Sequence, residues 1–78
     1  MTRVRLFAAA AEAAATEEVL VDADTIRELE RELDERFGAE FARVRAQCSL
    51  MVDGVRADAD ASLRSAATVD VLPPFAGG

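Results

Sequence analysis

The last six residues of the chain carry its clearest chemical signal. They read Pro73-Pro74-Phe75-Ala76-Gly77-Gly78. Neither terminal glycine has a Cβ, so this segment can pass through a narrow channel and adopt the backbone angles that a partner's active site imposes. Six extended residues reach at most roughly 20 Å, which is enough to enter such a site. We therefore expect residues 73–78 to form a flexible tail that presents the carboxylate of Gly78 to another protein.

A carboxylate is a poor electrophile until it is activated. Adenylation by ATP would convert it into an acyl phosphate anhydride, and sulfide or a persulfide could then displace AMP to leave a C-terminal thiocarboxylate. A carrier of this kind needs no acid, base or metal of its own. The alternative is that two terminal glycines are a frayed end or a tag remnant. The prolines and the strand signal directly before them favour a functional tail.

The rest of the chain holds few groups suited to catalysis. It has no His and no Lys, and Cys48 is its only cysteine. It therefore lacks the usual general base at neutral pH and the commonest metal ligand. A single cysteine forms no intramolecular disulfide and no thiolate cluster, and Cys48, at the start of an apolar segment, is expected to be a packed structural thiol. We expect no metal site, no bound cofactor and no catalysis by the chain alone.

The charge balance limits the classes of partner. Fifteen acidic residues against nine arginines give a net charge of −6. This charge repels phosphate backbones, so we expect no nucleic acid as partner. It would attract a basic protein surface, or it only keeps a small domain soluble. No apolar run approaches the roughly 18 residues of a membrane span, and the N-terminus alternates instead of forming a signal-peptide core. We expect a cytoplasmic protein with no membrane contact.

Alternating apolar and polar residues predict the strands that position the tail. The expected strands span residues 3–8, 18–21, 48–52 and 68–72, with a short return strand at 55–57. In the first strand Val4, Leu6 and Ala8 share one face and Phe7 lies on the other. Asp53-Gly54 is a strong turn signal before the return strand.

One amphipathic helix is expected after Thr25. This residue can serve as the N-cap, with Glu28 three residues later completing a capping box, and Gly38 is a natural C-terminal stop. The apolar residues at helical spacing are Ile26, Leu29, Leu33 and Phe37. The acidic residues between 28 and 35 are then expected to form a solvated face.

Three segments give weaker signals. Residues 9–15 are alanine-rich and predict a short helical turn or loop. Residues 40–46 predict another short turn, with Phe41 and Val44 facing inward. Residues 58–67 predict a loop with one turn around residues 62 and 63. The element order strand–strand–helix–strand–strand indicates an α+β domain over residues 1–72, followed by the tail.

Taken together, these segments resemble the small, sulfur-carrier subunits of molybdopterin synthase in the MoaD/ThiS family of ubiquitin-like β-grasp proteins. The resemblance covers essentially the whole chain. It rests on residues 4–8, 25–29, 52–54 and 69–78. The terminal Leu-Pro-Pro-x-x-Gly-Gly pattern favours the molybdopterin branch over the thiamin branch.

The resemblance implies a β-grasp fold, with a mixed sheet of four to five strands and one main helix packed across it. It implies that Gly78 is adenylated by an E1-like enzyme that uses ATP, and is then converted to 1-thioglycine. The tail would next enter the large synthase subunit, in a heterotetramer, and donate sulfur to a pterin precursor to form the dithiolene. The implied partner-binding surface is apolar, with Phe7, Leu72 and Phe75; the alternative for Phe7 is a core position.

The chain departs from the family pattern at three places. Ala11 stands where relatives often carry Arg, Ala66-Ala67 replace a Gly-Asp turn, and Arg56 occupies an apolar position. Two other functions therefore stay open. One is a related carrier for cysteine, thiamin or tRNA thiolation, or a protein modifier. The other is a β-grasp interaction module with an inert terminus.

Overall fold

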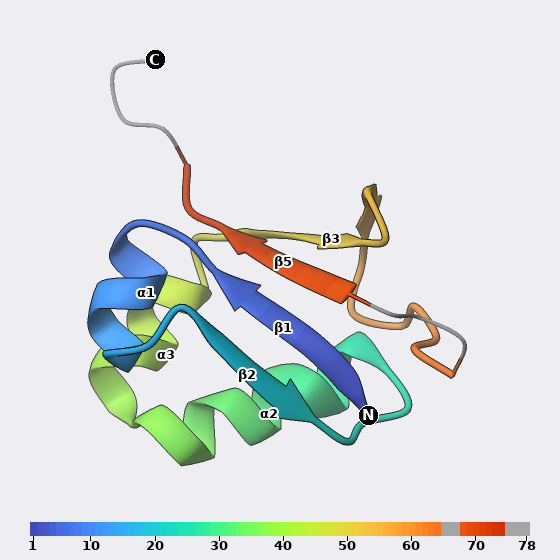
Figure 1. Ribbon diagram of the computed structural model, residues 1–78, viewed down its shortest axis with the longest axis horizontal. Helices are drawn as coiled ribbons and strands as arrows, with labels where there is room; N and C mark the ends of the chain where they lie inside the picture. Colours follow the sequence, from blue (N-terminus) through green and yellow to red (C-terminus); the bar gives the residue numbers. More distant parts are fainter. Residues whose placement is uncertain (65–67, 75–78) are drawn as a thin grey trace.

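The computed structural model describes residues 1–64 and 68–74. The elements in chain order are β1 (Thr2–Leu6), α1 (Ala9–Ala14), β2 (Glu18–Val21), α2 (Ile26–Phe37), α3 (Ala39–Arg45), β3 (Ser49–Val52), β4 (Val55–Ala57) and β5 (Thr68–Leu72) (Figure 1). The strands form one sheet in the order β2-β1-β5-β3-β4. Only β1 and β5 run parallel; the other neighbours are antiparallel. The expected mixed sheet is confirmed, with five strands.

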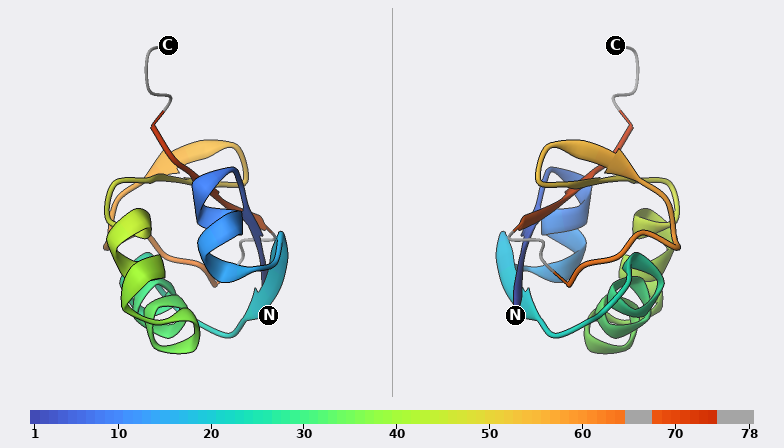
Figure 2. Two further views of the ribbon diagram at one scale, coloured as in Figure 1. Left: turned by 90° about the vertical axis from the view of Figure 1, so that its left-hand side faces the viewer. Right: turned by 90° about the vertical axis from the view of Figure 1, so that its right-hand side faces the viewer.

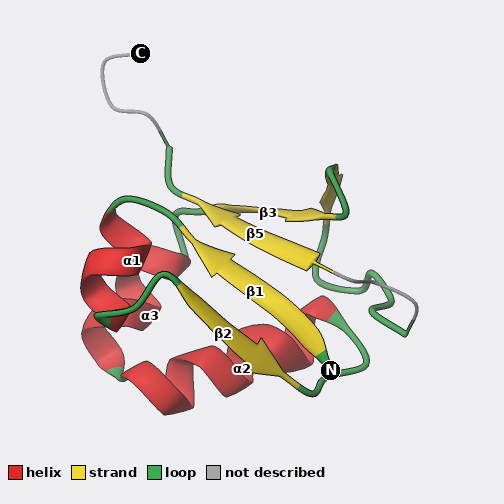
Figure 3. Ribbon diagram, in the orientation of Figure 1, coloured by secondary structure: helices red, strands yellow, loops and turns green. Residues whose placement is uncertain are grey.

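The sheet curves over the helices, and no other helix or strand of the described residues covers its outer face (Figure 2). Helix α2 crosses the inner face (Figure 3). The parallel register places Val4 beside Val69 and Leu6 beside Val71. All four side chains point inward, and each is almost completely buried. Apolar alternation in two strands that are far apart in sequence thus becomes one continuous apolar layer.

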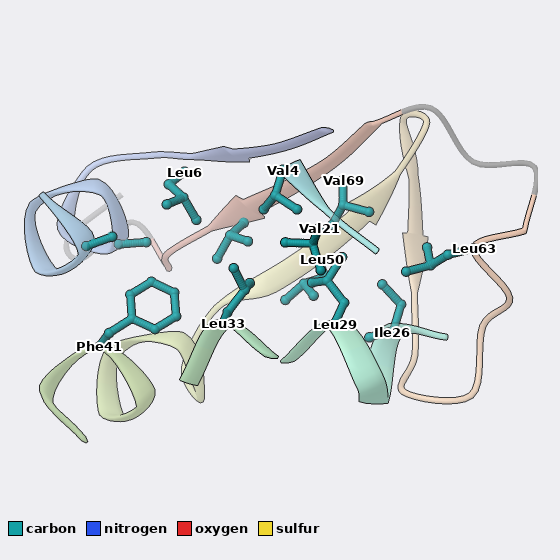
Figure 4. Packing of buried hydrophobic residues seen from close by; sticks show 13 residues of the cluster. Val4, Leu6, Val21, Ile26, Leu29, Leu33, Phe41, Leu50, Leu63 and Val69 are labelled. Carbon is teal, nitrogen blue, oxygen red and sulfur yellow. The ribbon is translucent and has the colours of Figure 1, made fainter. Parts of the chain in front are cut away.

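The core lies between this layer and the helices (Figure 4). Helix α2 contributes Ile26, Leu29 and Leu33, all buried as the helical spacing predicted. Phe41 of α3 is fully buried and is the largest side chain of the core. Its ring centroid lies 5.2 Å from that of Phe37, in a tilted arrangement that aromatic pairs favour. The two helices are therefore joined through their aromatic residues.

The predicted cap of α2 is present. The Thr25 hydroxyl accepts a hydrogen bond from the Glu28 N–H at 3.2 Å. The Glu28 carboxylate accepts one from the N–H of Asp24, one residue before the cap, at 2.9 Å. Gly38 ends the helix with a φ of 95°, a value that L side chains rarely adopt.

The loop after β4 also supports the start of α2. The carbonyls of Ala61 and Ala59 accept hydrogen bonds from the N–H groups of Ile26 and Arg27, at 3.0 and 2.9 Å. These donors have no partner within the helix itself. Leu63 is buried in the core, and its N–H donates to the Asp24 carbonyl at 2.8 Å. The expected loop is confirmed for residues 58–64, but its turn lies at residues 59 and 60 and not around 62 and 63, because Ser62 forms an isolated bridge with Thr25. Ala66-Ala67 lie outside the described residues.

Two strand boundaries were predicted wrongly. The first strand ends at Leu6, and Ala8 is exposed instead of facing the core. Its φ is 51°, because the chain turns there out of the sheet and into α1. Cys48 lies outside β3, since its N–H donates to the Arg45 carbonyl at 2.9 Å and not to a neighbouring strand. The alanine-rich segment after Ala8 forms a true helix, α1, and not an irregular loop.

None of the helices in the described ranges, 1–64 and 68–74, combines the length and apolar character that a membrane crossing requires.

Candidate functional site

The base of the tail is built on β5. This strand pairs with β1 on one side and β3 on the other, so its backbone is held from both sides. Beyond β5, Pro73 and Pro74 lead away from the body of the domain (Figure 1). Proline has no N–H to donate, so the sheet pairing ends there. The other predicted tail residues, Phe75, Ala76, Gly77 and Gly78, lie outside the described residues.

Phe7 and Leu72 flank this base. The strand alternation predicted that Phe7 lies opposite Val4 and Leu6, and the family resemblance implied that Leu72 is its neighbour. Phe7 follows the pair Leu6–Val71 in the parallel register, and its N–H donates to the Val71 carbonyl at 3.3 Å. Its side chain is 38% exposed, which decides against the core alternative. Leu72 pairs with Ser49 of β3 and is half-buried. The structure therefore brings two of the three predicted partner-binding residues to the same end of the sheet.

The outer side of the sheet is called here the open face. It consists of the outward-pointing strand residues and Phe7. Its members are Arg3, Arg5, Phe7, Glu18, Leu20, Ser49, Met51, Arg56, Thr68, Asp70 and Leu72. The resemblance implied an apolar surface, but the centre of this face is charged.

Arg5 and Asp70 form that charged centre. The Arg5 Nε lies 2.7 Å from Asp70 Oδ1, and Nη2 lies 2.8 Å from Oδ2, so the pair is bidentate. The hydrogen bond to Asp70 raises the pKa of Arg5 above its ordinary value. The guanidinium carbon also lies 5.8 Å from the centroid of the Phe7 ring, within cation–π range. No local pattern in the sequence indicates this pair, because only the β1–β5 register places residues 5 and 70 side by side.

A second ion pair extends the charged row to the sheet edge. Arg3 Nε lies 3.1 Å from Glu18 Oε2, and both side chains are about half exposed. Glu18 is also the register partner of Arg5. On the opposite side Met51 pairs with both Asp70 and Arg56. The open face thus alternates in charge across its middle, where Met51 separates Asp70 from Arg56, and its other apolar side chains, Phe7, Leu20 and Leu72, lie towards its periphery.

Two hollows border the site. A cavity of about 330 Å³ lies beside Phe7, lined by Arg5, Leu6, Ala8, Ala11, Glu17 and Glu18. Ala11 therefore lines a space that a longer side chain at this position would enter. A groove of about 470 Å³ runs along the tail base, lined by Ala9, Glu40, Arg43, Val44, Gln47, Pro73 and Pro74.

The acidic face of α2 was expected to be solvated, but two of its carboxylates are bound by an arginine. Asp34 and Glu30 bind Arg45 of α3, with Nη2 at 2.7 Å and Nη1 at 3.2 Å from their carboxylates. These side chains are only 18–26% exposed. The sequence pattern missed this contact because the turn at Gly38 folds α3 back towards α2.

Cys48 is packed as predicted. It is half-buried, and its thiol donates to the Val44 carbonyl at 3.3 Å. Burial raises the pKa of the thiol, and the nearby Arg45 lowers it by a smaller amount. At neutral pH the thiol is therefore protonated and poorly nucleophilic.

Comparisons with known proteins agree with this architecture. A scan against protein families matches residues 4–78 to the ThiS family. SAMP1 from Haloferax volcanii has a TM-score of 0.79 at 24% identity, covering 99% of this chain and 98% of that chain. A putative molybdopterin converting factor subunit 1 from Pyrococcus furiosus has a TM-score of 0.76 at 23% identity, covering 95% and 97%.

A chain in the complex of subunits 1 and 2 of the molybdopterin-converting factor from Helicobacter pylori has a TM-score of 0.74 at 22% identity, covering 99% and 97%. A search of curated protein sequences found no significant match. At these identities the solved structures establish a common fold and nothing finer. Because the family match includes all but the first three residues, this chain belongs to the ThiS family and has the ubiquitin-like fold of its sulfur carriers and modifiers.

Proposed function

We propose that this chain is the sulfur-carrying small subunit of a molybdopterin synthase. The observation that carries the proposal is the ThiS family match over residues 4–78, which includes the Gly-Gly tail. One structural neighbour is named as a putative subunit 1 of a molybdopterin converting factor, and another is a chain in a complex of subunits 1 and 2 of such a factor. The Leu72-Pro73-Pro74 exit from a central strand gives the tail a fixed origin. These observations favour a carrier over an interaction module with an inert terminus.

In the proposed reaction sequence an E1-like partner first activates Gly78. One carboxylate oxygen attacks the α-phosphorus of ATP and displaces pyrophosphate, which leaves an acyl adenylate. Hydrosulfide then attacks the carbonyl carbon, AMP departs with the electrons of the C–O bond, and loss of a proton leaves the thiocarboxylate. If a persulfide is the donor, a second thiol must reduce the acyl disulfide that forms. The thiocarboxylate is the 1-thioglycine that we propose at residue 78.

The second stage takes place in the large synthase subunit. The tail inserts there, and the thiocarboxylate sulfur attacks an electrophilic carbon of a pterin precursor, from which an oxygen leaving group departs. Water then hydrolyses the resulting thioester, which leaves the sulfur on the pterin as a thiolate and restores the carboxylate of Gly78. The complex of subunits 1 and 2 from Helicobacter pylori supports a large subunit as partner. We propose a heterotetramer of two carriers and two large subunits, working in the cytoplasm. All catalytic groups belong to the partners, and this chain contributes the tail, its base and the open face.

Intact mass spectrometry tests the carrier chemistry. The purified protein is incubated with ATP, a sulfide source and an E1-like activating enzyme encoded in the same genome. We expect a gain equal to the mass difference between sulfur and oxygen, located on the C-terminal peptide. Deleting Gly78 should abolish this gain. The thermal melt should be unchanged, because every buried core residue lies between Val4 and Val71.

Pathway assignment needs a separate measurement. Thiocarboxylated carrier, purified large subunit and pterin precursor should produce dithiolene, whereas the Gly78-deleted carrier should not. If the deleted variant still supported dithiolene formation, the tail mechanism would be wrong. If Gly78 is thiocarboxylated but several large subunits give no dithiolene, the chain is a carrier for another pathway.

A protein modifier is the second candidate, and one comparison favours it. The Haloferax volcanii neighbours are named SAMP1 and small archaeal modifier protein 1. The present chain has no lysine, so it cannot form lysine-linked chains with itself, although Gly78 could still be joined to another protein. Expression of a tagged chain should then give covalent conjugates that resist denaturation and depend on Gly78. Dithiolene formation without such conjugates would favour the molybdopterin role.

A further inference from the structure

Arg5 occupies the middle of the open face, close to the tail base. It lies on β1, next to β5, which continues into Pro73 and Pro74. Any enzyme that takes Gly78 into its active site must approach this end of the sheet, where Phe7 is the most exposed aromatic side chain among the described residues. The chemical character of the neighbouring Arg5 therefore bears on which enzyme surface can dock.

The guanidinium of Arg5 is held in one position with part of it exposed. Nε and Nη2 donate to Asp70, whose side chain is only 18% exposed, and the Phe7 ring lies against the guanidinium. Within the part of the chain that the structure describes, Nη1 has no hydrogen-bond acceptor. Arg5 is itself 47% exposed. An oriented guanidinium with free N–H groups binds a planar carboxylate at a small entropic cost.

The charge distribution over the molecule also favours the binding of a carboxylate at the open face. The open face carries three arginines, Arg3, Arg5 and Arg56, against the two carboxylates of Glu18 and Asp70. This leaves six of the nine arginines and 13 of the 15 acidic residues on the rest of the chain. The open face is thus slightly positive on a molecule with a charge of −6. A carboxylate-bearing surface is repelled by the other faces and accepted by this one, which fixes the docking orientation.

We propose that Arg5, held by Asp70 and Phe7, is a specificity-determining residue that binds a carboxylate on the enzyme that activates Gly78. The partner surface also presents apolar side chains to Phe7 and Leu72. This inference rests on the proposed function, because it requires an enzyme that activates the tail. It differs from the apolar docking surface implied for the family, since the recognition centre here is charged.

Steady-state kinetics of Gly78 thiocarboxylation test the proposal, with the carrier as the varied substrate. Arg5→Gln removes the charge but keeps a side chain that can donate a hydrogen bond to Asp70. We expect KM to rise at least about tenfold with little change in kcat, because one partner of an interfacial charge pair is lost. Arg27→Gln is the matched control. Arg27 is exposed and pairs with Asp60 at 3.0 Å, but it lies on α2 and not on the open face.

Salt dependence separates a carboxylate partner from a neutral acceptor. The KM of the unaltered carrier should rise with ionic strength, and this rise should be weaker for Arg5→Gln. Arg5→Lys keeps the positive charge but lacks the planar guanidinium with its paired N–H donors. Its KM should therefore lie between that of the unaltered carrier and that of Arg5→Gln. Equal salt dependence for the carrier and for Arg5→Gln would overturn the carboxylate assignment. Thermal melts of each variant establish that it is folded under the assay conditions.

The outcomes distinguish this inference from the proposed function. If no activating enzyme thiocarboxylates Gly78 in the unaltered carrier, the carrier function itself fails. If thiocarboxylation proceeds and Arg5→Gln has the same KM as Arg27→Gln, the carrier function stands and the role of Arg5 is refuted. A fall in kcat at unchanged KM would also refute it, because recognition of the carrier would then not depend on Arg5.

Discussion

Replacing Arg45 by methionine should destabilise the domain by breaking the link between α2 and α3. Arg45 holds Asp34 through two hydrogen bonds, at 3.0 and 2.7 Å, and Glu30 through one at 3.2 Å. The hydrogen bond to Asp34 is the main reason that the pKa of Arg45 is raised, and burial opposes the rise. Methionine keeps an unbranched apolar chain, so the substitution removes the charge and the hydrogen bonds more than the packing.

The size of the effect follows from partial burial. Hydrogen bonds to charged groups contribute about 1.5–3 kcal/mol, and loss of one partner of a fully buried pair costs about 3–5 kcal/mol. The Arg45, Asp34 and Glu30 side chains keep 18–26% of their exposure, so solvent screens part of this energy. We expect a loss of about 2 kcal/mol in the free energy of unfolding. For a domain of this size, that loss lowers Tm by roughly 8–16 °C.

Urea denaturation of a double-mutant cycle measures the interaction. The variants are Arg45→Met, Asp34→Asn and the combination of both, and the coupling energy should be at least about 1 kcal/mol. The matched control is Arg43→Met. Arg43 pairs with Glu40 on the same helix, but both side chains are about 70% exposed. This control should change stability by less than about 0.5 kcal/mol.

Equal destabilisation by Arg45→Met and Arg43→Met would refute the reasoning, because exposure would then not determine the strength of the pair. A coupling energy near zero between Arg45 and Asp34 would do the same. Raising the salt concentration should weaken the contribution of Arg45 only partly, since partly buried pairs are less screened than exposed ones.

Two further predictions concern the cap of α2 and the cysteine. Thr25→Ala removes the acceptor of the Glu28 N–H and should lower the free energy of unfolding, measured by urea denaturation, by about 1 kcal/mol. Thr25→Ser keeps a hydroxyl acceptor and should retain most of this stability. An Ala variant as stable as the parent would contradict the role of Thr25 as the cap. Burial raises the pKa of Cys48, so the folded state keeps its proton where the unfolded chain loses it. Stability should therefore fall as pH rises above about 8.5, the ordinary thiol value, and this fall should be smaller in Cys48→Ala. Denaturation across pH 7–10 checks this, and identical pH profiles for both proteins would contradict it.

Local signals in the sequence were sufficient to predict α2 and its boundaries. Thr25 and Gly38 mark its two ends through side-chain and backbone preferences that act within a few residues. The Asp53-Gly54 turn was found for the same reason, since both residues adopt positive φ, 48° and 87°, as this hairpin turn requires. The parity of its strand placed Phe7 opposite Val4 and Leu6 but left a core position open, and only its exposure in the structure decides for the surface.

Contacts between distant segments were not predictable in the same way. The pairing of β1 with β5 joins residues more than 60 positions apart, and no periodicity in either strand indicates its partner. The Arg5–Asp70 pair depends on that register and was missed. Arg45 was missed as a partner of Asp34 because the relative placement of α2 and α3 depends on packing around Phe41. A resemblance to a family supplied the fold, but it did not indicate how these charges pair.

The position of β5 explains how a small domain could present the proposed reactive tail without being destabilised by it. A tail that follows an edge strand would be anchored by one neighbour, and that strand would fray when a partner pulls on it. Here β5 is bonded to β1 and β3, and its inward residues Val69 and Val71 are fully buried. Detachment of β5, on which the tail is built, from its two neighbouring strands would therefore require the hydrophobic core to open. The proposed chemistry at Gly78 can then proceed in a partner's active site while the domain that presents it remains folded.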